Sequence, residues 1–526
     1  MTFHYIRVKT GQPIIFISTE NNNHANITLV NLMENSNNSY SHILKYTSLF
    51  GGVQMLNILI GLVRNKLVAV LLGPAGMGLV ALFSSTIKLV VDSTNFGLHI
   101  SAVRNISMAF DNGDEKWLRH EIEVFRHWIL ITALFGLVVC AALSSLLSDW
   151  TFSFGDHTLH FVLLSPVVAL TTLTVGETAI LKATRRLKAL AVTSIYGAIG
   201  VFAISVPIYW IYNYKGIVPS LVLMALVQAI IVLQCSLRLY PLQMRFRLDC
   251  IKEGTAFLRL GIAFVVAGML GSGAELAIRA YLSNASDVDT VGLYNAMYVM
   301  IFTYAGMVFT AIDTDYYPRL SAIKTHGEEL NDTVNNQIEV SMNIVSPLIV
   351  LFILFMPILL PLLYSGKFNA VIPMLQVAAL SMYGRGVFLP LEYIALSRGN
   401  SVTFLTIEIF SDVVLASLVI LGFNMFGLLG IGIAITTAYM LEMLFARIVC
   451  RIKYKYRMSS TVVRTILFHL AVGICVYAST HIESNLLYCL VGTLIFCADA
   501  WFSLNVVKKH TAIIEKLKGK FKKLVG

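Results

Sequence analysis

Charged residues are scarce in this sequence. Only 13% of its 526 residues are Asp, Glu, Lys or Arg, whereas about 25% is usual in soluble globular proteins. The apolar content of 57% and the mean hydropathy of +0.75 agree with this scarcity. The composition excludes a soluble enzyme with a membrane tail, a secreted disulfide scaffold and a disordered chain.

The motifs of several common chemistries are also missing. The seven cysteines are scattered and odd in number, and no CxxC or HExxH pattern occurs, so neither a disulfide framework nor a metal site is predicted. No GxxxxGK[ST] loop is present, so the chain is not expected to hydrolyse ATP itself. We therefore predict a protein that is not an enzyme and needs no cofactor.

Long apolar runs make up most of the sequence. A membrane-spanning helix needs about 20 mostly apolar residues, and lipid offers no partner to an open backbone, so such runs should be helical. We predict an all-α polytopic membrane protein with about 14 transmembrane helices, and short connections leave no room for a folded domain outside the membrane. The predicted spans are 44–70, 77–101, 128–147, 158–181, 189–212, 217–237, 257–282, 291–314, 341–364, 370–396, 402–423, 427–448, 462–480 and 486–507.

Lys and Arg are distributed unevenly among the connecting segments. With the N-terminus placed in the cytoplasm, 30 of the 39 basic residues fall in inside segments and only 3 in outside segments. This bias predicts an even number of spans with both termini cytoplasmic. It also accounts for most of the net charge of +10 without any nucleic acid.

The first and seventh spans resemble each other at an offset near 214 residues. In the segments LVRNKLVAVLLGPAGMGLVALFSS from Leu62 and LAIRAYLSNASDVDTVGLYNAMYV from Leu276, Gly78 falls opposite Gly292 and Arg64 opposite Arg279. Six spans per unit give two lobes in a parallel pseudo-repeat, a transporter plan with the substrate site between the lobes. The predicted units are an N-lobe at 43–240, a C-lobe at 241–457 and two extra helices at 458–508.

The two ends of the chain differ in character. Residues 1–42 are polar and Asn-rich and have no apolar core like that of a signal peptide. Either a true start at Met33 or a disordered cytoplasmic tail accounts for this segment. Residues 509–526 are basic and amphipathic, and we expect them to lie on the cytoplasmic surface of the membrane.

Several ionisable and amide side chains fall inside the predicted spans, where they are costly and tend to face a cavity or a partner. Lys88, Asp92, Asn95 and His99 are spaced to share one helical face of the second span. The cations exceed what topology needs, so we predict a cavity for an anion such as a diphosphate, which Arg binds with two parallel hydrogen bonds. The predicted cavity residues are Arg64, Lys66, Lys88, Arg279, Arg385, Gln54, Asn57 and Asn95.

Other interpretations of these charges stay open. Arg64, Lys66 and Arg279 lie near helix ends and could extend to lipid headgroups. Lys88 and Asp92 are spaced to neutralise each other as an i,i+4 ion pair. In the same way, the acidic residues of the eleventh span could simply join neighbouring helices.

Three blocks carry a resemblance to a known family. They are HILKYTSLFGGVQMLNILIGLVRNKLVAVLLGPAGMGLVALF from His42, YYPRLS from Tyr316 and LPLLYSGKFNAVIPMLQVAAL from Leu360. Through them the sequence resembles the bacterial O-antigen and oligosaccharide (Wzx-type) flippases of the multidrug/oligosaccharidyl-lipid/polysaccharide exporter superfamily. The resemblance in pattern extends over about residues 42–507.

The resemblance implies a V-shaped pair of lobes that work by alternating access. It implies an undecaprenyl-diphosphate-linked oligosaccharide as substrate, moved from the inner to the outer leaflet of the bacterial inner membrane for O-antigen, lipopolysaccharide or capsule synthesis. Membrane lipids and polysaccharide polymerase machinery are the other expected partners. Coupling to a proton or sodium gradient is also implied, and the candidate residues are Asp92, Glu275, Glu408 and Asp412.

Two alternative functions are considered. An ion-coupled exporter of drugs or organic cations from the same superfamily would show an acidic, aromatic cavity. A membrane polysaccharide polymerase would carry a large outer loop with catalytic Arg or His. The predicted outer loops, at 148–157, 213–216 and 424–426, are short and argue against the polymerase.

Overall fold

The computed structural model describes residues 22–152, 154–242, 255–323 and 327–525, and all regular secondary structure in these ranges is helical. The N-terminal half contains α1 (Asn22–Thr94), α2 (Leu98–Asp111), α3 (Glu115–Ala142), α4 (Ser144–Thr151), α5 (Thr158–Ala183), α6 (Leu187–Tyr212), η1 (Asn213–Gly216) and α7 (Ile217–Leu239). The C-terminal half contains α9 (Thr255–Ala285), α10 (Val288–Tyr298), η2 (Val299–Ala305), α11 (Met307–Ala322), α12 (Glu328–Leu363), η3 (Gly366–Val371), α13 (Ile372–Ala378), α14 (Ser381–Ser397) and α15 (Ser401–Tyr454). Two further helices follow, α16 (Ser460–Ser479) and α17 (Asn485–Val525). The prediction of an all-α polytopic membrane protein is confirmed.

The structure has fewer continuous helical ranges than the fourteen predicted spans. Ten helical ranges in the described residues are long and apolar enough to cross a membrane, or eleven if the bent pair of Gly366–Ala378 and Ser381–Ser397 is one span. With the bent pair counted as one span, the remaining difference of three arises because three long ranges each contain two predicted runs: Met55–Thr94, Leu187–Leu239 and Ser401–Tyr454. The shortest of them has 40 residues, which would extend about 60 Å as a straight helix, twice the hydrocarbon thickness of a bilayer.

A glycine and a proline break α1. Gly73 lies outside the helical region, with φ 65° and ψ −171°, and Pro74 follows it directly. Glycine adopts a positive φ without steric cost, and proline has no N–H to donate, so helical hydrogen bonding is interrupted here. The glycine-rich segment from Gly73 to Gly78 thus begins at the break in α1.

A second glycine break folds α15 back on itself. Gly427 has φ 58° and ψ −139°, and the helix axis is interrupted there. A β-carbon on Gly430 would lie only 1.8 Å from the carbonyl oxygen of Gly422, on the other side of the break. Residues eight apart in a straight helix lie about 12 Å apart, so this contact requires two antiparallel arms.

The second arm of α1 ends earlier than the sequence predicted. The predicted span 77–101 stops at Thr94, because the Asn95 side chain accepts a hydrogen bond from the Gly97 N–H at 2.8 Å and Gly97 turns the chain at φ 62°. The chain then enters the separate helix α2. The prediction that Asn95 and His99 continue the polar face of the preceding helix is therefore wrong.

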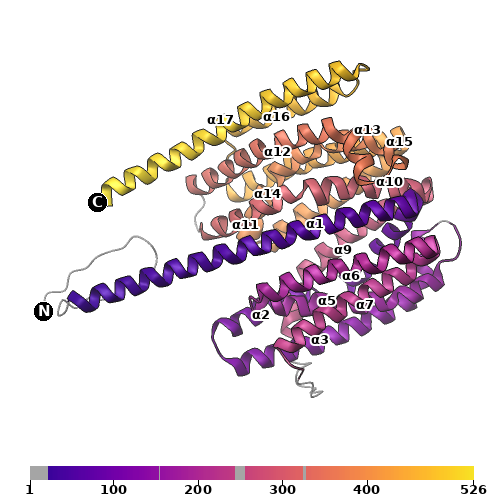
Figure 1. Ribbon diagram of the computed structural model, residues 1–526, viewed down its shortest axis with the longest axis horizontal. Helices are drawn as coiled ribbons and strands as arrows, with labels where there is room; N and C mark the ends of the chain where they lie inside the picture. Colours follow the sequence, from indigo (N-terminus) through magenta and orange to yellow (C-terminus); the bar gives the residue numbers. More distant parts are fainter. Residues whose placement is uncertain (1–21, 153, 243–254, 324–326, 526) are drawn as a thin grey trace.

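Two groups of helices are visible in Figure 1, with α1 and α9 between them. One group holds α2, α3, α5, α6 and α7, and the other holds the helices from α10 onward, with α16 and α17 along its outer side. Helix α1 packs on α6, α9 and α10, and α9 packs on both α1 and α15. Side chains that α1 and α9 direct at each other therefore lie between the two halves.

A buried polar network joins α16 and α17 to the C-terminal half. The His469 Nδ1 atom of α16 lies 2.9 Å from Asp499 Oδ1 of α17, and both side chains are fully buried. The hydroxyl of Ser346 on α12 donates to Asp499 Oδ2 at 2.9 Å, and Asn343 Oδ1 lies 3.3 Å from His469 Nε2. These contacts fix both helices against α12.

Several predictions for the ends of the chain lie outside the described part of the structure. Residues 1–21, the first part of the predicted polar tail, are not described, and α1 begins at Asn22. The backbone of 509–525 belongs to α17, but the side chains of the predicted amphipathic face are outside the described part. The proposed start at Met33 stays a prediction.

Candidate functional site

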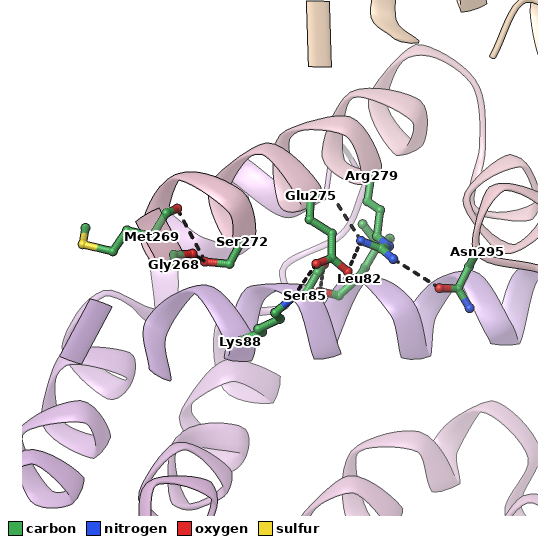
Figure 2. A network of polar contacts seen from close by, with 9 residues as sticks. All are labelled: Leu82, Ser85, Lys88, Gly268, Met269, Ser272, Glu275, Arg279 and Asn295. Carbon is green, nitrogen blue, oxygen red and sulfur yellow. Dashed lines mark hydrogen bonds and ion pairs between the residues drawn. The ribbon is translucent and has the colours of Figure 1, made fainter. Parts of the chain in front are cut away.

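A polar network connects α1 to α9 between the two halves. Lys88 Nζ lies 2.7 Å from Glu275 Oε2, and Arg279 Nη1 lies 2.6 Å from Glu275 Oε1. Arg279 Nη2 also donates to Asn295 Oδ1 on α10 at 3.3 Å. Figure 2 shows Lys88 reaching from one helix to Glu275 on the other, with Arg279 extending to Asn295. We call Lys88, Glu275, Arg279 and Asn295 the Glu275 network.

Exposure changes steeply across this network. The side chain of Lys88 is 54% exposed, that of Glu275 is 16% exposed and that of Arg279 only 4%. A buried guanidinium that is paired with a carboxylate holds that carboxylate in place. An exposed ammonium is available to an incoming anion. Lys88 is therefore the member best placed to contact a ligand, with Glu275 and Arg279 behind it.

Two glycines of α9 face acidic side chains of neighbouring helices. A β-carbon on Gly268 would lie 3.9 Å from Asp92 on α1, and one on Gly271 would lie 3.7 Å from Asp412 Oδ2 on α15. Two of the predicted ion-coupling residues, Asp92 and Asp412, thus flank α9 next to the Glu275 network.

Aromatic rings lie against two arginines, Arg279, which is buried, and Arg385, which is partly buried. The Arg279 guanidinium lies 5.6 Å from the centre of the Tyr294 ring and 5.1 Å from that of Tyr298. The Arg385 guanidinium lies 5.6 Å from the centre of the Phe302 ring. The negative faces of these rings attract cations and compensate in part for the loss of water. Tyr298 also lies within electrostatic reach of Lys88 and Arg385, so three of the five predicted cavity cations lie in this region.

The rings belong to one continuous stripe. Tyr294, Tyr298 and Phe302 follow one another at four-residue spacing, with ring centres 6.3 Å and 5.0 Å apart. The segment η2, which holds Phe302, is a π-helix, a local widening that is frequent at functional sites. The four-residue spacing of these rings is visible in the sequence, but the stripe was not predicted from it.

The other cations predicted for the cavity make different contacts. Arg64 donates from Nε to the Ser205 hydroxyl at 3.0 Å, and Tyr304 is within its electrostatic range. Lys66 donates to the carbonyl oxygen of Pro361 at 2.7 Å, across the two halves. None of the described contacts joins Arg64 or Lys66 directly to Lys88.

The amides predicted for the cavity are separated as well. Asn57 donates to the Ser194 hydroxyl at 2.6 Å within the N-terminal half. Asn95 caps the turn after α1 through its contact with Gly97. The side chain of Gln54 lies outside the described part of the structure. The structure thus groups Lys88, Arg279 and Arg385, and the described contacts of Asn57 and Asn95 lie elsewhere.

Carboxyl groups gather in the C-terminal half. Glu392 on α14 is buried and lies within hydrogen-bonding reach of Glu408 on α15, and Glu442 interacts with Glu408 and Asp412. Asp412 also interacts electrostatically with Lys88, which links this acidic group to the Glu275 network. Glu442 was missed in the sequence because it is a single acid in a long apolar run. Among the described residues, no three His, Cys, Asp or Glu side chains are arranged to hold a metal ion.

The fold matches that of known membrane transporters. The lipid II flippase MurJ in an inward closed conformation superimposes with a TM-score of 0.68 at 13% identity, over 87% of this chain and 99% of MurJ. An inward-facing multidrug resistance MATE family transporter of the MOP superfamily gives 0.60 at 14% identity, over 77% and 98%. The Vibrio cholerae MATE transporter VcmN gives 0.56 at 14% identity, over 78% and 98%. These matches define the class: a multi-pass membrane protein with the MOP superfamily fold.

The sequence itself identifies the family. Residues 67–373, more than half of the chain, match the family described as Polysaccharide biosynthesis protein. The chain therefore belongs to the Polysaccharide biosynthesis protein family. No curated protein sequence matches it. The resemblance to polysaccharide-pathway proteins of this superfamily is thus confirmed, and the transporter fold gives no support to the polymerase alternative.

Proposed function

We propose that this protein is a flippase for lipid-linked oligosaccharides. Its cargo would be an undecaprenyl-diphosphate-linked repeat unit, moved from the inner to the outer leaflet of the bacterial inner membrane for surface polysaccharide synthesis. Membership of the Polysaccharide biosynthesis protein family and a fold shared with a lipid II flippase support this cargo class. Both termini are proposed to be cytoplasmic, as the Lys and Arg distribution predicts.

The observation that carries the proposal is the half-exposed ammonium of Lys88 between the two halves. A diphosphate entering between α1 and α9 would pair with Lys88 and compete with Glu275 for it. Arg279 and Arg385, held against aromatic rings, add positive potential behind this point. The energetic cost of burying the anion would thereby be offset at the position where the halves meet.

Movement of the halves would carry the bound headgroup across the membrane. Lys88 belongs to α1 and Glu275 to α9, so a rocking motion changes the separation of these two groups. Pairing with substrate in one state and with Glu275 in the other gives the ligand a differential interaction with the two states, which alternating access requires. The remaining predicted cavity residues are proposed to contact the headgroup at other stages of its movement across the membrane. They are Arg64, Lys66, Asn57, Gln54 and Asn95.

Complementation of a flippase-null strain tests the cargo class. The wild-type gene should restore surface polysaccharide, and Lys88→Ala should abolish it while the protein stays in the membrane at normal abundance. Arg64→Ala should do the same. Lys182→Ala serves as a matched control, because Lys182 is an exposed lysine of α5 away from the Glu275 network. Normal polysaccharide in both site variants would contradict the proposed cationic site.

The acidic groups are proposed to couple transport to an ion gradient. Of the four candidates, Glu275 is held by two cations, whereas Asp412 Oδ2 is buried and has no hydrogen-bond partner among the described residues. Asp412, with Glu408 beside it, is therefore the better site for a transported proton than Glu275 or Asp92. Asp412→Asn should lower the rate of polysaccharide export, and the export that remains should be insensitive to an uncoupler. If an uncoupler inhibits this variant as strongly as the wild type, the assignment is contradicted.

One observation favours a second function. The carboxyl groups around Glu408 would suit an organic cation, as in an ion-coupled multidrug exporter. Expression in a drug-sensitive strain separates the two functions, because an exporter lowers the accumulation of cationic dyes and a flippase does not. Reduced dye accumulation without polysaccharide complementation would favour the exporter.

A further inference from the structure

A groove runs between α6 and α7 on the outside of the N-terminal half. Its volume is about 830 Å³, and it is lined by these two helices and by Arg186, which directly precedes α6. It contains no member of the Glu275 network and none of the acidic residues around Glu408. The proposed transport mechanism makes no use of it.

The groove is amphipathic along its length. At one end lie Arg186 and Lys188, at the start of α6, and Arg238, in the last turn of α7. The rest is mainly apolar, with Val192, Ile199 and other side chains of the two helices. No acidic side chain lines the groove in the part of the chain that the structure describes. One end therefore attracts anions and the other excludes water.

Two of the three cations are available to a ligand. Arg186 is partly engaged, because its Nε donates to the Tyr240 hydroxyl at 3.3 Å and its guanidinium lies 5.9 Å from the Tyr240 ring centre. Lys188 and Arg238 are both exposed. They come from different helices, so together they place two positive charges across the width of the groove.

The groove faces away from the site between the halves. On α6, Ser194 and Ser205 contact α1 through Asn57 and Arg64. Val192, Tyr196 and Ile199 lie on the opposite side of the same helix at 100° per residue, and all three are exposed. In a membrane this side of α6 contacts lipid, and the basic end lies where the sequence predicts the cytoplasmic surface.

We propose that this groove binds an anionic phospholipid of the cytoplasmic leaflet. The phosphate would pair with Lys188 and Arg238, and an acyl chain would lie along Val192 and Ile199 toward Gly200. Basic pockets between membrane helices on the cytoplasmic side suit such headgroups, and each nearby Lys or Arg contributes about 1 kcal/mol. The bound lipid would hold the adjacent ends of α6 and α7 together, as a structural lipid rather than as cargo.

Lipid binding to the purified full-length protein tests this proposal. Native mass spectrometry in detergent would compare phosphatidylglycerol with phosphatidylcholine, and the wild type should bind phosphatidylglycerol more tightly. The double variant Lys188→Gln with Arg238→Gln should weaken phosphatidylglycerol binding about thirtyfold, which corresponds to the loss of two such charges. A matched double variant, Arg104→Gln with Lys182→Gln, removes two exposed charges of the same half outside the groove and should leave binding unchanged.

A second variant tests the groove itself. Val192→Trp keeps every cation and fills the apolar part, so it should also reduce phosphatidylglycerol binding if the acyl chain lies there. Undecaprenyl diphosphate, added as a competitor, should not displace the phospholipid from the wild type. Any one of four results would overturn the proposal. The first two are equal binding of both phospholipids by the wild type and an equal loss of binding in the matched double variant. The other two are full phosphatidylglycerol binding by Val192→Trp and displacement of the phospholipid by undecaprenyl diphosphate.

Discussion

Gly78 and Gly292 pack against each other where the two halves of the chain meet. A β-carbon on Gly78 would lie 2.1 Å from the carbonyl oxygen of Val288, and one on Gly292 would lie 1.9 Å from the carbonyl oxygen of Pro74. Both pairs of equivalent residues, Gly78 with Gly292 and Pro74 with Val288, are separated by 214 positions. Such reciprocal contacts are what a two-fold relationship produces, so they support the parallel repeat predicted from the sequence.

Substituting either glycine should destabilise the protein. Gly78→Ala and Gly292→Ala each place a methyl group against a backbone carbonyl that cannot rotate away, and overpacking of this kind costs about 1–3 kcal/mol. Thermal unfolding in one detergent would measure the loss. Gly61→Ala is the matched control in α1, because nothing lies within 4 Å of its β-carbon and alanine favours a helix by about 1 kcal/mol. Equal stability of Gly78→Ala and Gly61→Ala would show that the halves are not in close contact here.

The Glu275 network should respond asymmetrically to substitution. Glu275→Gln removes the carboxylate from the buried Arg279, and loss of a buried ion-pair partner costs about 3–5 kcal/mol. Lys88→Gln should cost less than about 1 kcal/mol, because about half of the Lys88 side chain is exposed. Unfolding of the two variants in the same detergent gives the comparison. A larger loss for Lys88→Gln would place the structural role on the lysine and weaken its assignment to substrate.

Hydropathy predicted the helical content of the chain because lipid constrains every spanning segment in the same way. It located the apolar runs within each long helical range. For the second predicted span, 77–101, it placed the end beyond Thr94, where the helix stops. The turn at Asn95 depends on one side-chain hydrogen bond to Gly97, which carries no hydropathy signal. Local turn chemistry, rather than composition, therefore decided where that helix stops.

The candidate site was predicted residue by residue but not as a set of contacts. Helical spacing allowed a pair between Lys88 and Asp92, whereas the structure pairs Lys88 with Glu275, 187 residues further along. It also placed Glu275 and Arg279 on one face, where they do form an ion pair. A contact between helices depends on their packing, and no periodicity in a single sequence reports it.

A second buried ion pair offers a test of stability far from the proposed site. Arg126 on α3 binds Glu177 on α5 through two parallel contacts of 2.8 Å and 2.9 Å, and Ser236 of α7 donates to Glu177 at 2.5 Å. Glu177→Gln should destabilise the N-terminal half by about 3–5 kcal/mol.

The double variant Arg126→Met with Glu177→Leu completes this experiment. Replacing both charges with apolar side chains removes the unpaired buried group, so the double variant should be more stable than Glu177→Gln alone. Unfolding in a common detergent would measure all three proteins. A double variant less stable than Glu177→Gln would show that the two charges do not act as a pair.

The contact between Asp499 and His469 should control how firmly α16 and α17 are attached. Asp499→Ala leaves His469 and Ser346 without their shared buried acceptor, and an unpaired buried polar group costs about 1–3 kcal/mol. Amide hydrogen exchange should therefore accelerate in α16 and α17 and stay unchanged in α9. Asp156→Asn, at an exposed aspartate before α5, is the control and should leave exchange unaltered throughout. Faster exchange in α9 as well would mean that these two helices support the whole fold, because their loosening would then reach the helix that carries Glu275.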